Sequence, residues 1–508
     1  MVNTIIFNDE ITMWWKYDEY PNAVKYTFYL DGKRHGETTK THYSFLRLQA
    51  EQIYRVRIEI ENNDGNTVTE GYVFQTKKAK NCIDVTKPPY SAVGDGKTMN
   101  TCAIQKALND CTANDFVYFP AGVYLTGALD VRSDTEMYLE EGARLQGSAK
   151  ATDYLPKTIS RFEGTEMMCY RSLLNLGKLN RNDGYTTENI VVRGKGTIFG
   201  GGKPLALEIM ETERAELKEF LEKNADYVKT CENENTIPGR VRGRLIQTCN
   251  CANVVLSGLK LGYGASWNLH FIYSKNIVTY NCEVMSEKLY NADGSLEMEN
   301  VWNGDGWDPD SSENCTVFHT LFNTYDDGIA IKSGKNPEGN IVNRPTKNVC
   351  VFDCKGKNGV AIGSEISGGI DGVYVWDCEY LHTPASVNIK TTVKRGGFVR
   401  NIYVYNCDLL GFYVRTRLNY NNDGDGAESL TKMENIHLET VRLNSKDISH
   451  FNELIEGKPI YIDGFDGEEN FVDGIVFKNV SVAKSDDNKQ MKAYICNAKN
   501  VKMDVTLF

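Results

Sequence analysis

The chain has 508 residues, of which 41% are hydrophobic and 25% charged, and its formal net charge is -11 at pH 7. A chain of this length can bury more than one hydrophobic core, and its negative charge argues against nucleic acid as a general partner. The sequence has no apolar run of about 18 residues, so we expect no transmembrane helix and no membrane partner.

The first 80 residues predict a small β-sandwich. Alternating strand patterns at 25–30 and 54–60 are separated by turn signals such as Asp31-Gly32. The pattern resembles a fibronectin type III module, with a junction to the next domain at 77–80. We expect residues 1–80 to act as a spacer or lid, in preference to an independent carbohydrate-binding module.

Residues 81–508 predict a larger all-β domain. It opens with a glycine-rich loop and an amphipathic helix over 100–111, and the loop lacks the GxxxxGK[ST] pattern of a phosphate site. Short strands then recur behind an Asn or Gly, and Asn tolerates the left-handed conformation of a corner. This recurrence predicts a parallel β-helix. The residues 204–224 have helical periodicity and form an insertion between coils.

Three aspartates within 303–335 carry the predicted chemistry. Asp305 lies in Asn-Gly-Asp-Gly, and Asp326 and Asp327 lie in Tyr-Asp-Asp-Gly, 21 residues further on, beyond an alternating segment at 315–322 that predicts one strand. That interval is about one coil of a β-helix, and equivalent points on adjacent coils lie about 4.8 Å apart. Adjacent aspartates can share one site only at a bend, which the following glycine permits. Taken singly, each aspartate is simply a turn residue. Together they suit glycosidic bond hydrolysis, with one protonated acid and one base behind a water.

Four of the 14 cysteines occupy the same place in similar segments (YNCEV, FDCKG, WDCEY and YNCDL). In stacked coils, Cys282, Cys354, Cys378 and Cys407 would form a ladder of small buried thiols. Metal ligation is the weaker alternative, because no CxxC pair or histidine cluster accompanies them. Free thiols, and an N-terminus without a basic start and apolar core, predict a cytoplasmic protein. A secreted chain trimmed of its signal would look the same.

Four motifs, NGDG-x-DPDSS, DDGIAIKSGKN, GVAIGSE-x-SGG and NIKTT-x-x-RGG, follow one another in an order that resembles glycoside hydrolase family 28, the polygalacturonase family. The chain most resembles the bacterial exo-acting members, over roughly residues 82–508. The resemblance implies a right-handed parallel β-helix of the pectin-lyase type, capped by the segment at 100–111. It also implies an inverting hydrolysis of α-linked galacturonides that needs no metal or other cofactor.

By that resemblance Asp326 is the general acid, and Asp305 and Asp327 hold and activate the water. Asn303 would orient Asp305, whereas Asp308 and Asp310 are interpreted as structural. The other expected substrate-binding residues are Trp267, His270, Lys332, Lys357, Asn358, Asn388 and Lys390. Core or cleft-wall roles are equally open for Trp267 and His270.

Two positions depart from the family pattern. Its Gly-His-Gly-Gly reads Gly356-Lys357-Asn358-Gly359, and its Arg-x-Lys reads Asn388-Ile389-Lys390. An amide does not replace a bidentate guanidinium, so we expect altered substrate recognition. The stretch 328–400 holds ten basic and six acidic residues, a local charge of +4, which favours a cleft for an acidic sugar over chance patchiness.

The sequence therefore predicts an exo-acting hydrolase of an acidic oligosaccharide, with its oligomeric state left open. One alternative is a hydrolase that releases another α-linked sugar from rhamnogalacturonan-type fragments. A second is a pectate lyase, which would use Ca²⁺ and an Arg or Lys base. A third is a non-catalytic binding solenoid, which the presence of all three aspartates disfavours.

Overall fold

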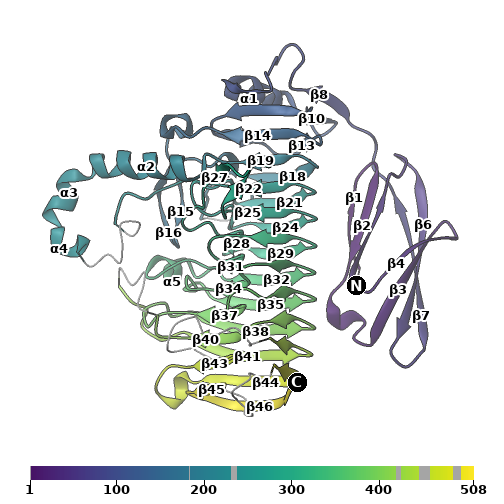
Figure 1. Cartoon of the computed structure of the whole chain (residues 1–508), viewed down its shortest axis with the longest axis vertical. Coiled ribbons are helices and arrows are strands. Elements are labelled where there is room, and N and C mark those ends of the chain that lie inside the picture. Colours follow the sequence, from purple (N-terminus) through teal and green to yellow (C-terminus); the bar gives the residue numbers. More distant parts are fainter. Residues whose placement is uncertain (1, 182–183, 230–236, 419–424, 445–457, 484–492) are drawn as a thin grey trace. The chain divides into compact units, whose positions relative to one another are not determined.

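The computed structural model describes residues 2–181, 184–229, 237–418, 425–444, 458–483 and 493–508, and the chain divides into two compact units, Met1–Asn81 and Cys82–Phe508 (Figure 1). Within the described ranges, none of the helices has the length and apolar character needed to span a membrane.

The first unit is a sandwich of two antiparallel sheets. On β6 the side chains of Tyr54, Val56, Ile58 and Ile60 are buried between more exposed neighbours, as expected for a strand with one core face. They pack with Ile11, Met13 and Phe45 of the opposite sheet, and with Trp15, into one core. The assignment to the fibronectin type III class stays a prediction. One sheet consists of β1 (Asn3–Ile6), β2 (Glu10–Trp14) and β5 (His42–Leu46), and the other of β4 (Lys33–Thr38), β3 (Ala23–Leu30), β6 (Ile53–Asn62) and β7 (Thr67–Gln75).

The second unit is a parallel β-helix, and its coils are stacked along one axis (Figure 1). A typical coil contributes one strand to each of three columns, and strands of one column pair in parallel with their neighbours on adjacent coils. This confirms the predicted fold class.

The first column consists of β10 (Asp115–Phe119), β13 (Glu136–Leu139), β18 (Thr187–Gly194), β21 (Cys251–Ser257), β24 (Lys275–Tyr280), β29 (Glu313–Phe318), β32 (Thr346–Phe352), β35 (Ile370–Trp376), β38 (Phe398–Tyr405), β41 (Lys432–Glu439) and β44 (Val472–Val482), with β8 (Asn81–Asp84) paired to β10 and β46 (Ala498–Leu507) paired to β44. The second column consists of β9 (Asp95–Met99), β11 (Gly122–Thr126), β14 (Ala143–Gly147), β19 (Thr197–Phe199), β22 (Lys260–Gly262), β25 (Glu283–Met285), β30 (Leu321–Asn323), β33 (Lys355–Gly356), β36 (Glu379–Tyr380), β39 (Asp408–Leu409) and β42 (Arg442–Leu443).

The third column is an 11-stranded parallel sheet of its own. Inward residues of all three columns fill the core; Ile277, Cys315, Val349 and Val373, for example, are register partners on successive coils and are fully buried. The strands of the third column are β12 (Leu129–Val131), β17 (Leu174–Gly177), β20 (Ile246–Cys249), β23 (Leu269–Ile272), β28 (Trp307–Asp310), β31 (Ile329–Ile331), β34 (Val360–Ile362), β37 (Val387–Lys390), β40 (Phe412–Arg415), β43 (Ile460–Asp463) and β45 (Ala493–Cys496).

A ladder of asparagines lies at the predicted corner of the first column. These residues have positive φ, and each side-chain amide donates a hydrogen bond to the asparagine of the preceding coil: Asn253 to Asn189 at 3.0 Å, Asn276 to Asn253 at 2.9 Å, Asn314 to Asn276 at 3.2 Å and Asn348 to Asn314 at 2.7 Å. On the next coil Gly372, with φ of 79°, takes the same place. Both residue types reach this left-handed conformation with little strain, which explains their recurrence in the sequence.

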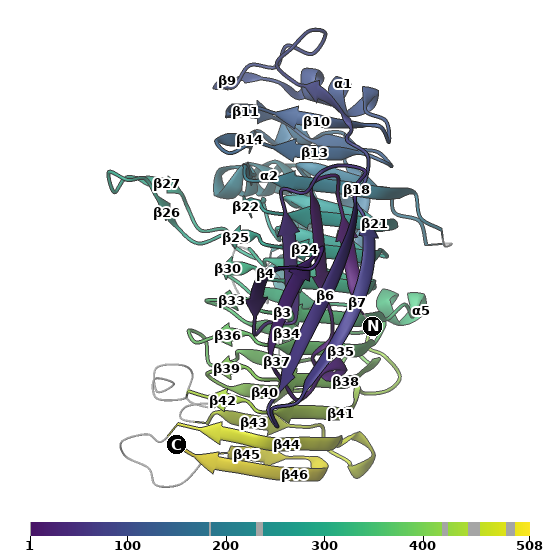
Figure 2. The same cartoon turned by 90° about the vertical axis from the view of Figure 1, so that its right-hand side faces the viewer.

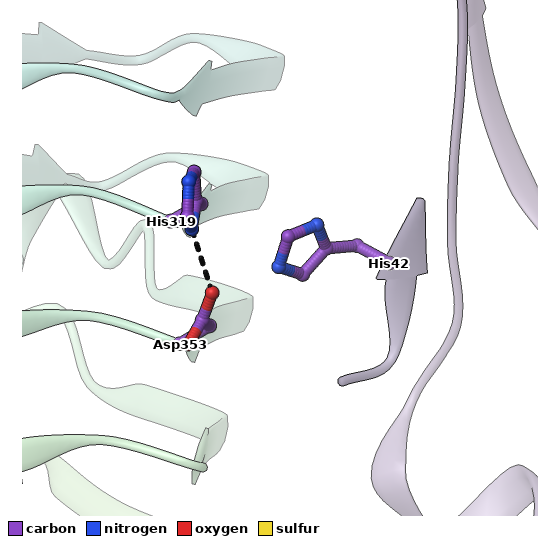
Figure 3. A group of neighbouring side chains, drawn as sticks. All are labelled: His42, His319 and Asp353. Atoms are coloured by element: carbon purple, nitrogen blue, oxygen red, sulfur yellow. Dashed lines mark hydrogen bonds and ion pairs between the residues drawn. The ribbon is translucent and has the colours of Figure 1, made fainter. Parts of the chain in front are cut away.

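The segment 315–322, which the alternation predicts as one strand, is two strands with a corner between them. β29 ends at Phe318, and β30 begins at Leu321 after His319, whose φ is 48°. His319 Nδ1 and Asp353 Oδ2, at the same corner of the next coil, are hydrogen bonded at 2.7 Å (Figure 3). The prediction was wrong here because alternation continues past a sharp corner and does not reveal it.

The predicted thiol ladder exists, with one interruption. Cys354, Cys378 and Cys407 are buried on successive coils, and each Sγ contacts the carbonyl oxygen two residues earlier at 3.1–3.3 Å. Thr320 occupies the place between Cys282 and Cys354. No disulfide bond links the cysteines of the described ranges.

Helices and hairpins decorate the coils. Helix α1 (Thr101–Asp110) buries Ile104, Ala107 and Leu108 at the start of the β-helix, within the helix predicted at 100–111. The helical insertion is also present, as α2 (Gly202–Glu216), α3 (Lys218–Lys223) and α4 (Ala225–Val228), although α3 and α4 bury no residue. Further elements are a hairpin of β15 (Thr158–Phe162) and β16 (Thr165–Cys169), helix α5 (Glu338–Val342), and a hairpin of β26 (Leu289–Tyr290) and β27 (Leu296–Met298) that projects from the coils (Figure 2).

Candidate active site

The three aspartates lie in turns that lead from the second column into the third. Asp305 precedes β28, and the pair Asp326-Asp327 precedes β31 on the next coil. The backbone N–H of Gly306 donates to the carbonyl of Asp327 at 3.0 Å, and that of Trp307 to the carbonyl of Gly328 at 3.1 Å. The 21-residue interval therefore places the three residues on adjacent coils, in equivalent turns.

Local packing explains why a glycine follows Asp305 and another follows the pair Asp326-Asp327. A Cβ at Gly306 would lie 2.4 Å from the carbonyl oxygen of Gly328, and a Cβ at Gly328 would lie 2.3 Å from that of Asn358. The side-chain amide of Asn358, one coil further on, donates to the carbonyls of Thr324 and Asp326 at 2.9 and 2.7 Å. Asn358 therefore fixes the bend that presents Asp326 and Asp327.

Asp305 is the most buried of the three, with 3% of its surface exposed. Its Oδ2 accepts a hydrogen bond from Lys332 Nζ at 3.2 Å, and the same ammonium lies 3.6 Å from Glu365 and 4.1 Å from the ring centroid of Trp267. Burial raises the pKa of Asp305 to about 8, although Lys332 opposes the shift. The negative charges of Asp326 and Asp327 act in the same direction as burial.

Asp326 and Asp327 are half-buried. Burial and the neighbouring Asp327 raise the pKa of Asp326, and Lys390 Nζ lies 2.6 Å from Asp327 Oδ2. Since interacting carboxyls titrate as a group, the cluster retains a proton at higher pH than a free carboxyl would. A retained proton is what a general acid requires. Because Asp305 and Asp327 each contact a lysine ammonium, a metal cation would compete with these lysines for the carboxylate oxygens.

Asp310 belongs to a buried network beside the site. It accepts from Arg161 Nη1 at 2.6 Å and lies 3.1 Å from His270 Nε2. The Arg161 and His270 partners hold the pKa of Asp310 well below its usual range despite burial, and burial lowers the pKa of His270 to about 4. His270 is therefore neutral at physiological pH and supports Asp310. Asp308 is also fully buried, and in the described part of the chain neither of its carboxyl oxygens has a hydrogen-bond partner.

Three buried arginines around the site could not be predicted from the sequence. Arg161 comes from β15, Arg242 donates to Asn303 Oδ1 at 2.8 Å, and Arg244 lies 4.4 Å from the ring of Trp267. Burial lowers the pKa of Arg242 to about 9. No motif marks these arginines, because they lie in segments between coils, and only folding brings them to the aspartates.

The residues at the two positions that depart from the family pattern differ in exposure and in their contacts. The exposed Lys357 forms an ion pair with Glu287. Asn388 is 4% exposed, and its Oδ1 accepts a hydrogen bond from Arg415 Nε at 3.1 Å. Trp267 is buried and stacks parallel to Phe162, with ring centroids 6.4 Å apart, so its position is that of a support for Lys332.

Known proteins match most of the chain. Residues 143–504 match the model of the Glycosyl hydrolases family 28, and residues 82–168 match the model described as Rhamnogalacturonase A/epimerase, pectate lyase-like. An exo-poly-alpha-D-galacturonosidase of Dickeya chrysanthemi is 29% identical over 363 residues, which cover 68% of this chain and 57% of that protein. A probable polygalacturonase of Vitis vinifera is 28% identical over 329 residues, 62% of this chain and 58% of that protein. The matched part thus spans under two thirds of the length of these relatives.

Solved structures share the fold. A family 28 exopolygalacturonase of Yersinia enterocolitica superposes with a TM-score of 0.76 at 20% identity, covering 100% of this chain and 95% of that chain. An exopolygalacturonase of Thermotoga maritima gives a TM-score of 0.65 at 21% identity, covering 84% and 91%. At these identities the likeness shows the fold alone.

Proposed function

The chain belongs to the glycosyl hydrolases of family 28, and from this membership we propose that it is an inverting, exo-acting hydrolase of α-linked galacturonides. The observation that supports the proposal best is the placement of Asp305, Asp326 and Asp327 in equivalent turns of adjacent coils, with Lys332 and Lys390 on their carboxylates. The name of the Dickeya relative points to the same activity.

In the proposed mechanism Asp326 gives its proton to the glycosidic oxygen of the leaving sugar. Asp305 and Asp327 hold a water molecule on the opposite side of the sugar ring, and one of them takes its proton as the oxygen attacks the anomeric carbon. Acid and base carboxyls about 6.5–9.5 Å apart leave room for that water and produce inversion. The proton that leaves Asp326 is balanced by the proton taken from water.

The charges near the site support an acidic oligosaccharide as the substrate. Lys332 directly follows β31, the strand after the Asp326-Asp327 turn, and Lys390 ends β37, two coils further on; both contact the aspartates. A carboxylate on a sugar ring would be attracted to these ammonium groups in a partly desolvated site.

The hairpin β15–β16 supports attack at a chain end. It leaves the β-helix between β14 and β17 and lies along several later coils (Figure 1). Arg161 reaches Asp310, the carbonyl of Gly164 accepts from the N–H of Lys335 at 2.8 Å, and the N–H of Glu166 donates to Glu338 on α5 at 3.0 Å. A hairpin anchored in this way would form a wall on one side of the substrate site, and such a wall would favour a terminal sugar over the middle of a polymer.

The test uses Asp326→Asn on two galacturonide substrates, one natural and one with a good leaving group. Turnover of the natural substrate should fall by about 10²–10⁴-fold, the usual share of general acid catalysis. The loss should shrink with the good leaving group, because that group needs no proton. Asp305→Asn and Asp327→Asn should slow both substrates, since water activation is needed in each case.

Asp408→Asn is the matched control, because Asp408 pairs with Arg442 in the second column. Its activity should equal that of the wild type. Near-normal activity of Asp326→Asn on the natural substrate would refute the acid assignment. An ultraviolet-absorbing unsaturated product in place of a new reducing end would show a lyase.

A further inference from the structure

Three cations lie at equivalent positions at the ends of third-column strands beside the aspartates, with Gly363 at that position on the coil between the first two. Lys332 follows β31, Lys390 ends β37, and Arg415 ends β40. Lys390 and Arg415 are register partners on adjacent coils, so their Cα atoms are separated by about 4.8 Å. The set of cations thus extends one coil beyond the lysine that contacts Asp327.

Arg415 differs from the two lysines in its partner. Both lysines contact carboxylates, whereas the described contact of Arg415 is to the neutral amide of Asn388. Asp463 is its register partner on the following coil, yet within the described residues no carboxylate lies within 4.0 Å of the Arg415 guanidinium. Its positive charge is therefore not neutralised by an ion pair there, and the side chain is partly exposed.

Asn388 stands where the family pattern has an arginine, and it orients Arg415. The hydrogen bond at 3.1 Å uses Nε, and among the described residues the Nη1 and Nη2 donors have no hydrogen-bond partner. These two nitrogens form a planar fork that matches both oxygens of a carboxylate. An amide acceptor can hold the guanidinium in place without cancelling its charge.

We propose that Arg415 binds the carboxylate of the substrate sugar next to the catalytic aspartates and so replaces the arginine that is absent at position 388. This inference rests on the proposed function. It assigns specificity for acidic sugars to a different coil from the one that carries the family's Arg-x-Lys pattern.

The test compares wild type and Arg415→Ala on trigalacturonate and on its methyl ester, which lacks the charge. For trigalacturonate kcat/KM should fall by about 10–100-fold, the value of a charged hydrogen-bonded contact. For the methyl ester it should change by less than about threefold, because an ester makes only the weaker neutral contact. Arg415→Lys should recover part of the loss, since an ammonium keeps the charge but not the fork.

A second measurement separates binding from chemistry. Asp326→Asn is expected to bind trigalacturonate without cleaving it. When Arg415→Ala is added to that variant, calorimetry should show a rise in Kd of about 10–100-fold, equal to the fall in kcat/KM. Arg417→Ala is the matched control, because Arg417 already contacts Asp466 at 2.9 Å and the carbonyl of Gly464 at 3.0 Å. Its effect on kcat/KM should stay within about threefold.

A rescue variant makes the inference falsifiable even if Arg415→Ala perturbs the fold. Asn388→Arg added to Arg415→Ala should restore most of the discrimination between trigalacturonate and its ester. Equal losses on the two substrates, or no loss, would overturn the inference while leaving the proposed function standing. Failure of the wild type to hydrolyse either substrate would overturn both.

Discussion

Burial and charge act against one another at Asp305. Lys332 stabilises the ionised carboxylate, but loss of water and two nearby aspartates favour the protonated form, and the pKa rises to about 8. Burying this carboxyl lowers the stability of the folded protein, and favourable contacts elsewhere must offset that cost. Such costs are common at functional sites.

The raised pKa predicts a pH-dependent stability difference. Above about pH 4 the unfolded chain releases the Asp305 proton while the folded protein keeps it, so the contribution of Asp305 to stability falls as pH rises towards 8. Asp305→Asn does not titrate and escapes this loss. Relative to wild type it should gain stability between pH 4 and pH 8, on the order of a few kcal/mol. Urea unfolding of both proteins across this range measures the difference.

Asp293→Asn provides the control for that experiment. Asp293 lies on an exposed turn, where hydrogen bonds from Ser295 hold its pKa below the usual range. Its stability difference from wild type should therefore change only at acid pH and remain flat from pH 5 to pH 8. A flat profile for Asp305→Asn as well would contradict the burial argument.

The sequence could place the aspartates but not most of their partners. The motif spacing located Asp305, Asp326 and Asp327, because the coil between their two turns carries no long insertion. Arg161 contacts Asp310, a residue 149 positions away, and nothing local marks that pairing. Lys390 was expected only as a substrate contact, yet it lies 2.6 Å from Asp327, so Lys390→Ala would also disturb a carboxylate that we propose activates water.

At the scale of elements, the asparagine ladder allows two contributions to the stability of a corner to be measured separately: its hydrogen bonds and its left-handed backbone conformation. Asn314 donates to Asn276, accepts from Asn348 and has a φ of 54°. Asn314→Ala should lower the free energy of unfolding by about 2–4 kcal/mol, through two lost hydrogen bonds and a strained conformation. Asn314→Gly should cost only about 1–2 kcal/mol, because glycine accepts positive φ. Chemical unfolding of the two variants measures both values, and equal losses would show that conformation plays no part.

Strand and corner positions were predictable from Asn-led repeats, whereas the hairpin β15–β16 was not. Its strands are short, and their pairing is local, so they resemble the many loops that leave a coil. Its importance comes from the distant contacts of Arg161, Gly164 and Glu166, which depend on the stacking of coils already formed.

At the scale of the whole molecule, the cysteines predict the redox state. No disulfide links the cysteines of the described ranges, and most of them are buried. The denatured, non-reduced protein should therefore titrate all 14 thiols with a thiol reagent. Mostly oxidised cysteines would contradict both the stacked-thiol interpretation and the cytoplasmic location, which remains a proposal.

The two kinds of connection in the β-helix have a consequence for how such a chain can evolve. The asparagine corner keeps one Asn or Gly on coil after coil, whereas the turn into the third column varies from the long segment between β25 and β28 to the short one between β33 and β34. A one-residue insertion at the corner would reverse the facing of every side chain in that strand. Duplication of a whole coil would instead preserve every contact type. Mutation can thus lengthen the axis only in whole-coil steps, while the turns that carry the aspartates change freely in size.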